Sequence, residues 1–237
     1  SDVYKRQVQE LGQPDMIFLP GSKNTMGDLR WMRQNGLEAA VKKLAAHIPV
    51  WGICGGYQML GRTISDPHGV ENENSLREPL RGMELIDTDT TLMPEKMRTQ
   101  TRGKYENVTG IFSTLSGLEF SGYEIHMGKT TVSTGEHQTP LVQLADGRTD
   151  GVQRMEKGSE TPGVYGSYVH GIFDDGDIAV RIVQALADKK RVSWKPEAGG
   201  DYHAFKEQQY DKLAQGLREH LDMEYVYSIL QESRISS

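Results

Sequence analysis

The sequence contains one cysteine, Cys54, in 237 residues, which excludes an internal disulfide. No apolar run approaches the ~20 residues that a membrane-spanning helix needs, and the first residues lack the pattern of a signal peptide. There is no long basic block either: 27 Lys and Arg stand against 33 Asp and Glu, for a formal net charge of -6. We therefore expect a cytoplasmic protein that binds neither nucleic acid nor membrane, and that has no metal site in this chain.

The chain is expected to divide into three parts. Residues 1–7, SDVYKRQ, look like the translation of an adapter used in sequencing libraries, and are set aside from fold reasoning. Residues 8–194 have enough apolar character for one domain with a hydrophobic core, and residues 195–237 read as a helical extension with leucines on one face.

Short apolar runs alternate with helical patterns along the main domain. This alternation predicts an α/β fold, with a mixed sheet flanked by helices. The strands are expected at 16–19, 48–53 and 163–173, the helices at 28–46 (broken at Asn35-Gly36), 57–60 and 177–189, a sheet extension of short strands at 63–150, and a helical tail at about 204–230.

Cys54 lies in the segment Gly52-Ile53-Cys54-Gly55-Gly56, between a predicted strand and a predicted helix. Glycines two residues before and after it match the G-x-S-x-G spacing of a nucleophile elbow, where larger side chains would clash. Such a turn exposes the sulfur, and the backbone N–H groups at the helix start favour a thiolate and can hold an oxyanion. A lone cysteine is more often a small core residue, but here the glycines favour a nucleophile.

A thiol that attacks an amide needs a base and an acid, and imidazole serves as both near neutral pH. His170, in Tyr168-Val169-His170-Gly171, ends a predicted strand and is our preferred candidate. His126 is the alternative, because it lies in another strand-like segment whose Glu124 would point to the same face. Position 172 is Ile, so no carboxylate follows His170 at the spacing of a Cys-His-Glu triad, and a dyad or a remote orienting group is implied.

Several separated segments together resemble the class I glutamine amidotransferases, which have a flavodoxin-like fold, and among them the glutaminase domains of the cobyric acid synthase family. The matching segments are LPGSKNT at 19–25, GICGGYQMLG at 52–61, GYEIH at 122–126 with Gly128, YVHGIF at 168–173, and the tail at 211–230.

This resemblance implies roles for individual residues. Cys54 would be the nucleophile and His170 the base, with Gly21 and Gly55 on the oxyanion side and Gln58 in contact with substrate glutamine; Tyr57, Glu124 and His126 are further candidates. The family is similar in lacking the carboxylate after the histidine. It also begins with strands ahead of Asp15, so we expect this sequence to be truncated at its N-terminus.

The resemblance also implies partners that lie outside this chain. Ammonia from glutamine would pass to an N-terminal ATP-binding synthetase domain, which amidates the corrinoid adenosylcobyrinic acid a,c-diamide in cobalamin biosynthesis. This chain has no G-x-x-x-x-G-K-[ST] loop, so ATP and Mg²⁺ are expected in that missing domain and no cofactor here. Two alternatives remain open: a lipid II-amidating glutaminase subunit of cell-wall synthesis, and a non-catalytic module on the same fold.

Overall fold

The computed structural model describes residues 11–71, 78–133, 137–155, 163–175, 177–196 and 202–235. The chain separates into two compact units, Ser1–Lys195 and Pro196–Ser237. No helix among the described residues has the length and apolar character to cross a bilayer.

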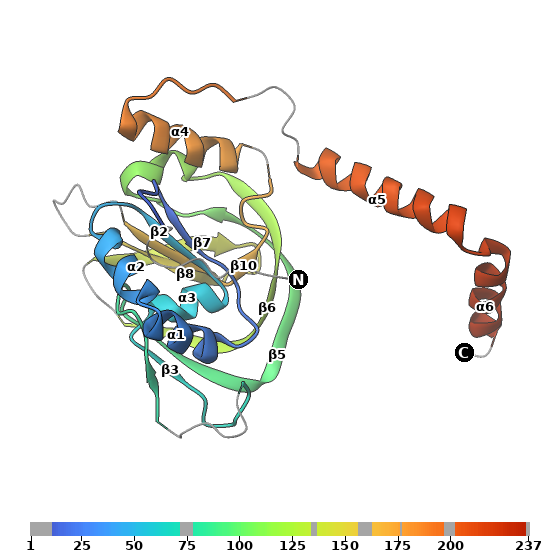
Figure 1. Ribbon diagram of the computed structural model, residues 1–237, viewed down its shortest axis with the longest axis horizontal. Coiled ribbons are helices and arrows are strands. Elements are labelled where there is room, and N and C mark those ends of the chain that lie inside the picture. The colour runs from blue at the N-terminus through green and yellow to red at the C-terminus, as the bar shows by residue number, and fades with distance from the viewer. Residues whose placement is uncertain are drawn as a thin grey trace. The chain divides into compact units, whose positions relative to one another are not determined.

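The first unit is built on one ten-stranded mixed sheet (Figure 1). Its main path has the order β1-β2-β9-β8-β7-β5-β3-β4, while β6 pairs with both β5 and β10. The strands are β1 (Ile17–Leu19), β2 (Val50–Ile53), β3 (Thr63–Ser65), β4 (Leu80–Arg81), β5 (Thr88–Tyr105), β6 (Glu119–Val132), β7 (Gln138–Leu144), β8 (Thr149–Arg154), β9 (Val164–Ser167) and β10 (Val169–His170). The predicted α/β class is confirmed.

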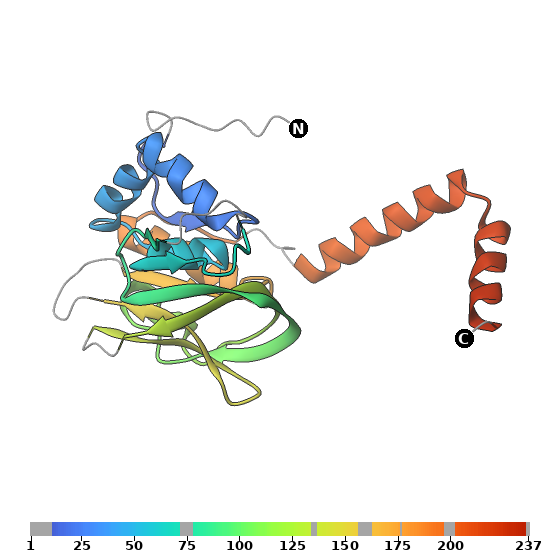
Figure 2. The same cartoon turned by 90° about the horizontal axis from the view of Figure 1, so that it is seen from below.

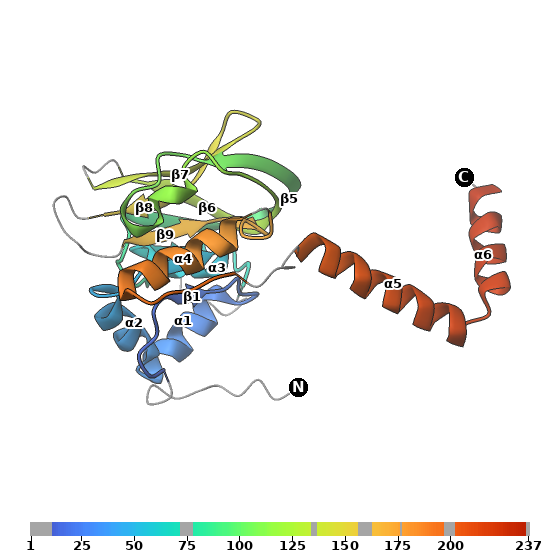
Figure 3. The same ribbon diagram turned by 90° about the horizontal axis from the view of Figure 1, so that it is seen from above.

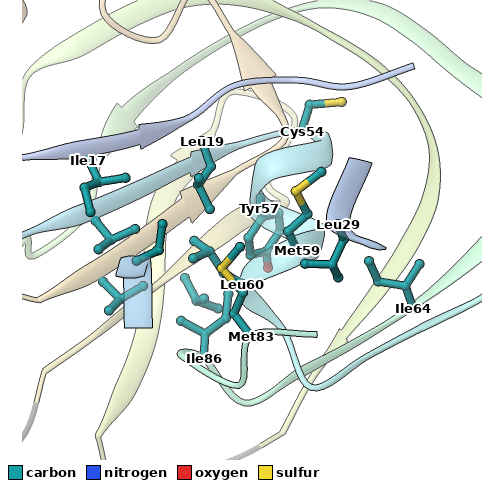
Figure 4. Close-up of a cluster of buried hydrophobic side chains, with 14 of the residues drawn as sticks. Ile17, Leu19, Leu29, Cys54, Tyr57, Met59, Leu60, Ile64, Met83 and Ile86 are labelled. Carbon is teal, nitrogen blue, oxygen red and sulfur yellow. The ribbon is translucent and has the colours of Figure 1, made fainter. Parts of the chain in front are cut away.

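Hydrophobic residues on the two faces of the central strands form two cores, because successive side chains of a strand point to opposite faces. Val50 joins a core that includes residues of α1 (Thr25–Gln34), α2 (Leu37–Ala45) and α3 (Gly55–Leu60), part of which Figure 4 shows. Its neighbour Trp51 joins the other core, with Tyr165 of β9, Phe112 of the 3-10 helix η2 (Gly110–Leu115) and Ile178 of α4 (Ile178–Lys190). α4 packs against η2, and it lies at the top of Figure 1 and at the front of Figure 3.

Three differences from the sequence expectations concern local structure. The sheet extension is not made only of short strands, because β5 and β6 have 18 and 14 residues and pair along most of their length (Figure 2). The expected strand at 163–173 bends at Tyr168 and becomes β9 and β10, which have different partners. The tail forms two helices, α5 (Tyr202–His220) and α6 (Met223–Ile235), since Asp222 accepts a hydrogen bond from the backbone N–H of Tyr225 and caps the second.

The topology places three loops at one edge of the sheet. β1, β2 and β9 are neighbours and parallel, with Leu19 opposite Gly52 and Ile53 opposite Ser167. Their carboxyl ends therefore lie together, and functional residues gather at such an edge in α/β proteins. Gly21, Cys54 and His170 all follow these ends.

Candidate active site

Cys54 occupies a sharp turn between β2 and α3. Its backbone has φ 52° and ψ -109°, a conformation that residues with a side chain rarely adopt. The backbone N–H of Cys54 donates to Ser167 O at 2.9 Å, and its carbonyl accepts from the N–H of Gln58 at 3.1 Å. The strand-turn-helix that the glycine spacing predicts is present, with Cys54 at its strained centre.

The glycines around Cys54 allow close contacts between backbone segments. A Cβ on Gly56 would lie 2.0 Å from the carbonyl oxygen of Leu19, and one on Gly52 would lie 2.7 Å from the carbonyl of Gly56. A Cβ on Gly55 would lie 2.7 Å from the backbone nitrogen of Ser22. The elbow is thus packed directly against the loop that follows β1.

Replacing Gly56 with alanine should destabilise the first unit, although alanine usually stabilises a helix. The added Cβ would meet backbone that cannot move freely, so we expect a loss of about 2–3 kcal/mol of unfolding free energy. Thermal or urea unfolding measures it. Gly216→Ala is the control, because a Cβ at this helical glycine meets nothing within 4 Å, and equal stability of the two variants would contradict the packing argument.

The sulfur of Cys54 lies at the edge of the core, where Figure 4 shows it beyond the buried apolar side chains. The residue is 8% exposed, and Sγ lies 3.6 Å from the carbonyl oxygen of Ile125. Burial raises the pKa of the Cys54 thiol, although the backbone N–H of Gly55 acts to lower it. The helix start does favour the thiolate, as expected, but burial outweighs it. Cys54 therefore rests as a thiol and needs a base.

His170 faces the same turn from the end of β10. A Cβ on Gly21 would lie 3.1 Å from Cε1 of His170 and 3.6 Å from Cβ of Cys54, so both residues flank Gly21. The imidazole stacks on Tyr123 with ring centroids 5.1 Å apart. Burial, and then the charge of His126, lower the pKa of His170. An imidazole kept unprotonated beside a thiol can act as its base.

Within the described part of the chain, Nε2 of His170 is buried without a hydrogen-bond partner. Of the acids that follow His170 in the sequence, Asp175 accepts hydrogen bonds from the backbone N–H and the hydroxyl of Ser121.

A cavity of about 640 Å³ joins these groups. Its lining includes the predicted site residues Gly21, Cys54, Gln58, His126 and His170. Charged side chains also line it, and these are Lys23, Glu71 and Lys96. The cavity that contains the Cys54 thiol is therefore lined by both positively and negatively charged side chains.

Gln58 and Tyr57 occupy different surroundings. Gln58 is 3% exposed, and its Nε2 donates to the hydroxyl of Tyr168 at 3.2 Å while the side chain lines the cavity of Cys54. Tyr57 packs edge-on against Tyr168 and lines a second cavity of about 420 Å³, which does not include Cys54. Tyr57 thus supports Tyr168 from the core side.

Glu124 and His126 of β6 form a polar cluster with the exposed side chain of Arg148. The Glu124 carboxylate is 2% exposed and accepts from Arg148 at 2.7 and 3.3 Å, while its Oε1 lies 3.6 Å from Nε2 of His126. The interaction with His126, and then the pair with Arg148, lower the pKa of Glu124 to about 2. The carboxylate is therefore charged at any working pH.

Sequence reasoning missed Glu71, which lies between strands β3 and β4. Its carboxylate accepts from the backbone N–H groups of Thr25 and Met26, each at 2.9 Å, at the start of α1. Asp66 in turn accepts from the N–H groups of Val70 and Glu71. These bonds fix the loop that carries Gly21, and nothing in the spacing of Glu71 and Thr25 along the chain signals the contact.

Replacing Glu71 with glutamine should lower the stability of the protein and raise the reactivity of Cys54. The amide oxygen replaces a charged acceptor at the start of α1, so we expect a loss of about 1 kcal/mol of unfolding free energy. The charge of Glu71 contributes to raising the pKa of Cys54, so its loss should speed alkylation of Cys54 by iodoacetamide near pH 7.5. Glu84→Gln, which changes an exposed ion pair, is the control. Slower alkylation than in the wild type would contradict the assignment.

Comparison with known proteins agrees with this geometry. Residues 2–178 match the family model of the CobB/CobQ-like glutamine amidotransferase domain. The chain belongs to this family. The family resemblance expected from the sequence is confirmed over the segments that carry Gly21, Cys54, Gln58, Glu124, His126 and His170.

Curated relatives of this CobB/CobQ-like chain include two cobyric acid synthases. The one from Ruminiclostridium cellulolyticum is 46% identical over 235 residues, which are 97% of this chain and 44% of that protein. The one from Lachnoclostridium phytofermentans is 39% identical over 237 residues, 97% of this chain and 45% of that protein. The chain thus spans less than half the length of these relatives.

A solved structure supports the fold alone. The structure of PurLQS from Thermotoga maritima superposes with a TM-score of 0.52 at 15% identity, covering 78% of this chain and 83% of that one. The class I amidotransferase fold predicted from the sequence is confirmed.

Proposed function

We propose that this chain is a glutaminase, which hydrolyses glutamine with Cys54 as nucleophile and His170 as base and releases ammonia. One observation carries the proposal: a cysteine in a strained elbow and a histidine flank Gly21 in one cavity. Membership of the CobB/CobQ-like amidotransferase family supports it.

The reaction begins from the uncharged pair. His170 takes the Cys54 proton as sulfur attacks the side-chain carbonyl carbon of glutamine, and the carbonyl oxygen becomes an oxyanion. We assign the N–H of Gly55 and the backbone after Gly21 to hold that oxyanion, because a Cβ on Gly55 would lie only 2.7 Å from the backbone nitrogen of Ser22, so the two segments meet beside Cys54. His170 then protonates the leaving nitrogen, so ammonia departs and a γ-glutamyl thioester remains on Cys54.

Hydrolysis completes the cycle. His170 removes a proton from water, whose oxygen attacks the thioester carbon, and the thiolate leaves and regains its proton from His170. Glutamate is released with the sulfur unchanged. The charged cavity residues fit the amino acid end of glutamine, with Lys23 and Lys96 available for its carboxylate and Glu71 for its ammonium group.

We further propose that the ammonia serves a cobyric acid synthase in the cytoplasm. In this assignment an ATP-dependent synthetase part of the full-length protein, with its Mg²⁺, activates carboxylates of adenosylcobyrinic acid a,c-diamide and receives the ammonia. The cobyric acid synthase relatives favour this corrinoid over lipid II, the alternative acceptor.

Two assays test the two levels of this proposal. Purified chain supplied with glutamine should release glutamate and ammonia in equal amounts, and asparagine should give far less of either product. Full-length protein with ATP, Mg²⁺ and glutamine labelled with ¹⁵N in the side-chain amide should transfer the label to the corrinoid and not to lipid II. Labelled lipid II would contradict the acceptor, whereas absence of glutamate would contradict the glutaminase itself.

A further inference from the structure

His126 and Glu124 have no place in the mechanism above, although they lie beside it. His126 lines the cavity that contains Cys54 and His170, and its side chain is only 11% exposed. Glu124, two residues earlier, is among the most buried charged groups of the described chain. A buried charge is costly unless it is paired, so such a cluster needs a reason.

Both ring nitrogens of His126 face oxygen acceptors. Nδ1 lies 2.9 Å from the carbonyl oxygen of Gly128, which only accepts, so Nδ1 carries a proton. Nε2 lies 3.6 Å from Oε1 of Glu124, an ionised carboxylate that also only accepts. A lone pair on Nε2 would face that negative charge. No hydrogen bond to Nε2 is present among the described residues, so a proton on this nitrogen would face the Glu124 carboxylate across 3.6 Å.

The same ring is held rigidly. It stacks on Tyr168 with centroids 3.8 Å apart and planes 16° apart, a geometry that favours a cation over an aromatic face. The Tyr168 hydroxyl is fixed in turn by Gln58 at 3.2 Å and Thr130 at 2.6 Å. Tyr168 precedes β10 by one residue, so the frame that holds His126 is joined directly to the strand that presents His170.

We propose that His126 is a positioning residue for the glutaminase reaction. With Nδ1 bonded to Gly128 and Nε2 facing the Glu124 carboxylate, a positive charge on this ring disfavours a second positive charge on His170, which stays ready to accept the Cys54 proton. This inference rests on the proposed glutaminase function. In this proposal the buried carboxylate of Glu124 lies beside His126. In a Cys-His-Glu triad a carboxylate would instead lie beside the catalytic histidine, His170.

The electrostatics of the site agree with this geometry. The charge of His126 is a cause, after burial, of the lowered pKa of His170. Other titratable or charged groups also surround the two histidines. They are Lys23, Cys54, Glu71, Lys96, Tyr123, Glu124, Arg148, Asp150 and Tyr168. Of these, Arg148 is bonded to Glu124, and Asp150 accepts from Ser167 and from the backbone of Tyr168.

The test compares a neutral and a charged substitution by their pH profiles. His126→Asn removes the charge, so protonation of His170 should become easier and the acid limb of kcat/KM for glutamine should move to higher pH. We expect the loss relative to wild type to be about tenfold at pH 6 and to shrink toward pH 8.5. His126→Lys keeps a positive charge and should bring the limb back toward that of the wild type.

Two controls separate this role from a structural one. His47→Asn changes an exposed histidine before the amino end of β2 and should leave the profile unchanged. NMR titration of labelled histidines gives a readout that needs no turnover: the His170 resonance, identified by its loss in His170→Gln, should titrate at higher pH in His126→Asn. If the His126→Asn variant proves unfolded by circular dichroism, Glu124→Gln with the same titration replaces it.

The outcomes are distinct. A loss in His126→Asn that is equal at every pH, or an unmoved His170 titration, would overturn the proposal. Failure of the wild type to hydrolyse glutamine would overturn the proposed function instead, while the NMR titration would still decide whether His126 acts on His170.

Discussion

Cys54→Ala is expected to lose glutaminase activity by at least about 10⁴-fold, because the sequence has no other cysteine to supply the attacking thiol. Alanine keeps the small buried side chain, and the cavity with its charged lining should still bind glutamine. Glutamate release measured with excess enzyme, together with glutamine binding by calorimetry, gives both quantities. Retained binding with lost turnover is the expected combination.

Cys54→Gly supplies a control for folding. Glycine adopts φ 52° and ψ -109° without strain, so this variant should be inactive yet more stable than Cys54→Ala by about 1 kcal/mol. Residual activity of either variant within tenfold of wild type would contradict the role of Cys54. Lower stability of the glycine variant would contradict the strained elbow.

His170→Ala is expected to lower kcat/KM by about 10³-fold, since the buried thiol then has no base. The wild-type acid limb should lie below the usual histidine range, because the pKa of His170 is lowered and a lowered pKa leaves the base form present at more acidic pH. A pH profile of kcat/KM measures both effects. On the acid side, kcat/KM should fall only at pH values low enough to protonate His170.

The comparison with His126 decides between the two histidines that the sequence leaves as candidates. If His170 is the base, His170→Ala should lose far more activity than His126→Asn at pH 8, and His47→Ala should lose none. A greater loss of activity in His126→Asn than in His170→Ala would show that His126, and not His170, is the base.

The elbow could be predicted because its requirements are local. A strained turn that contacts neighbouring backbone needs glycines at fixed distances from Cys54, and these appear as Gly52 and Gly56 in the sequence. The parallel strands before each loop are short apolar runs, so the meeting of Gly21, Cys54 and His170 at one edge follows from the sheet topology.

The surroundings of the site could not be predicted, because they depend on pairings between distant segments. Glu71 reaches the start of α1 across 45 residues, and Arg148 reaches Glu124 from the turn between β7 and β8. The bend at Tyr168, which separates β9 from β10, leaves no mark in an apolar run that reads as one strand. Burial of Cys54 likewise reverses the pKa shift that the turn alone suggests.

In the proposed reaction Cys54 forms a covalent thioester with the side chain of glutamine. Mass spectrometry of the protein treated with 6-diazo-5-oxo-L-norleucine, a reactive glutamine analogue, tests it most directly. We predict one adduct per chain on the peptide that contains Cys54, protection by excess glutamine, and no adduct in Cys54→Ala. An adduct that persists in Cys54→Ala, or modification of Cys54 that glutamine does not slow, would contradict the account.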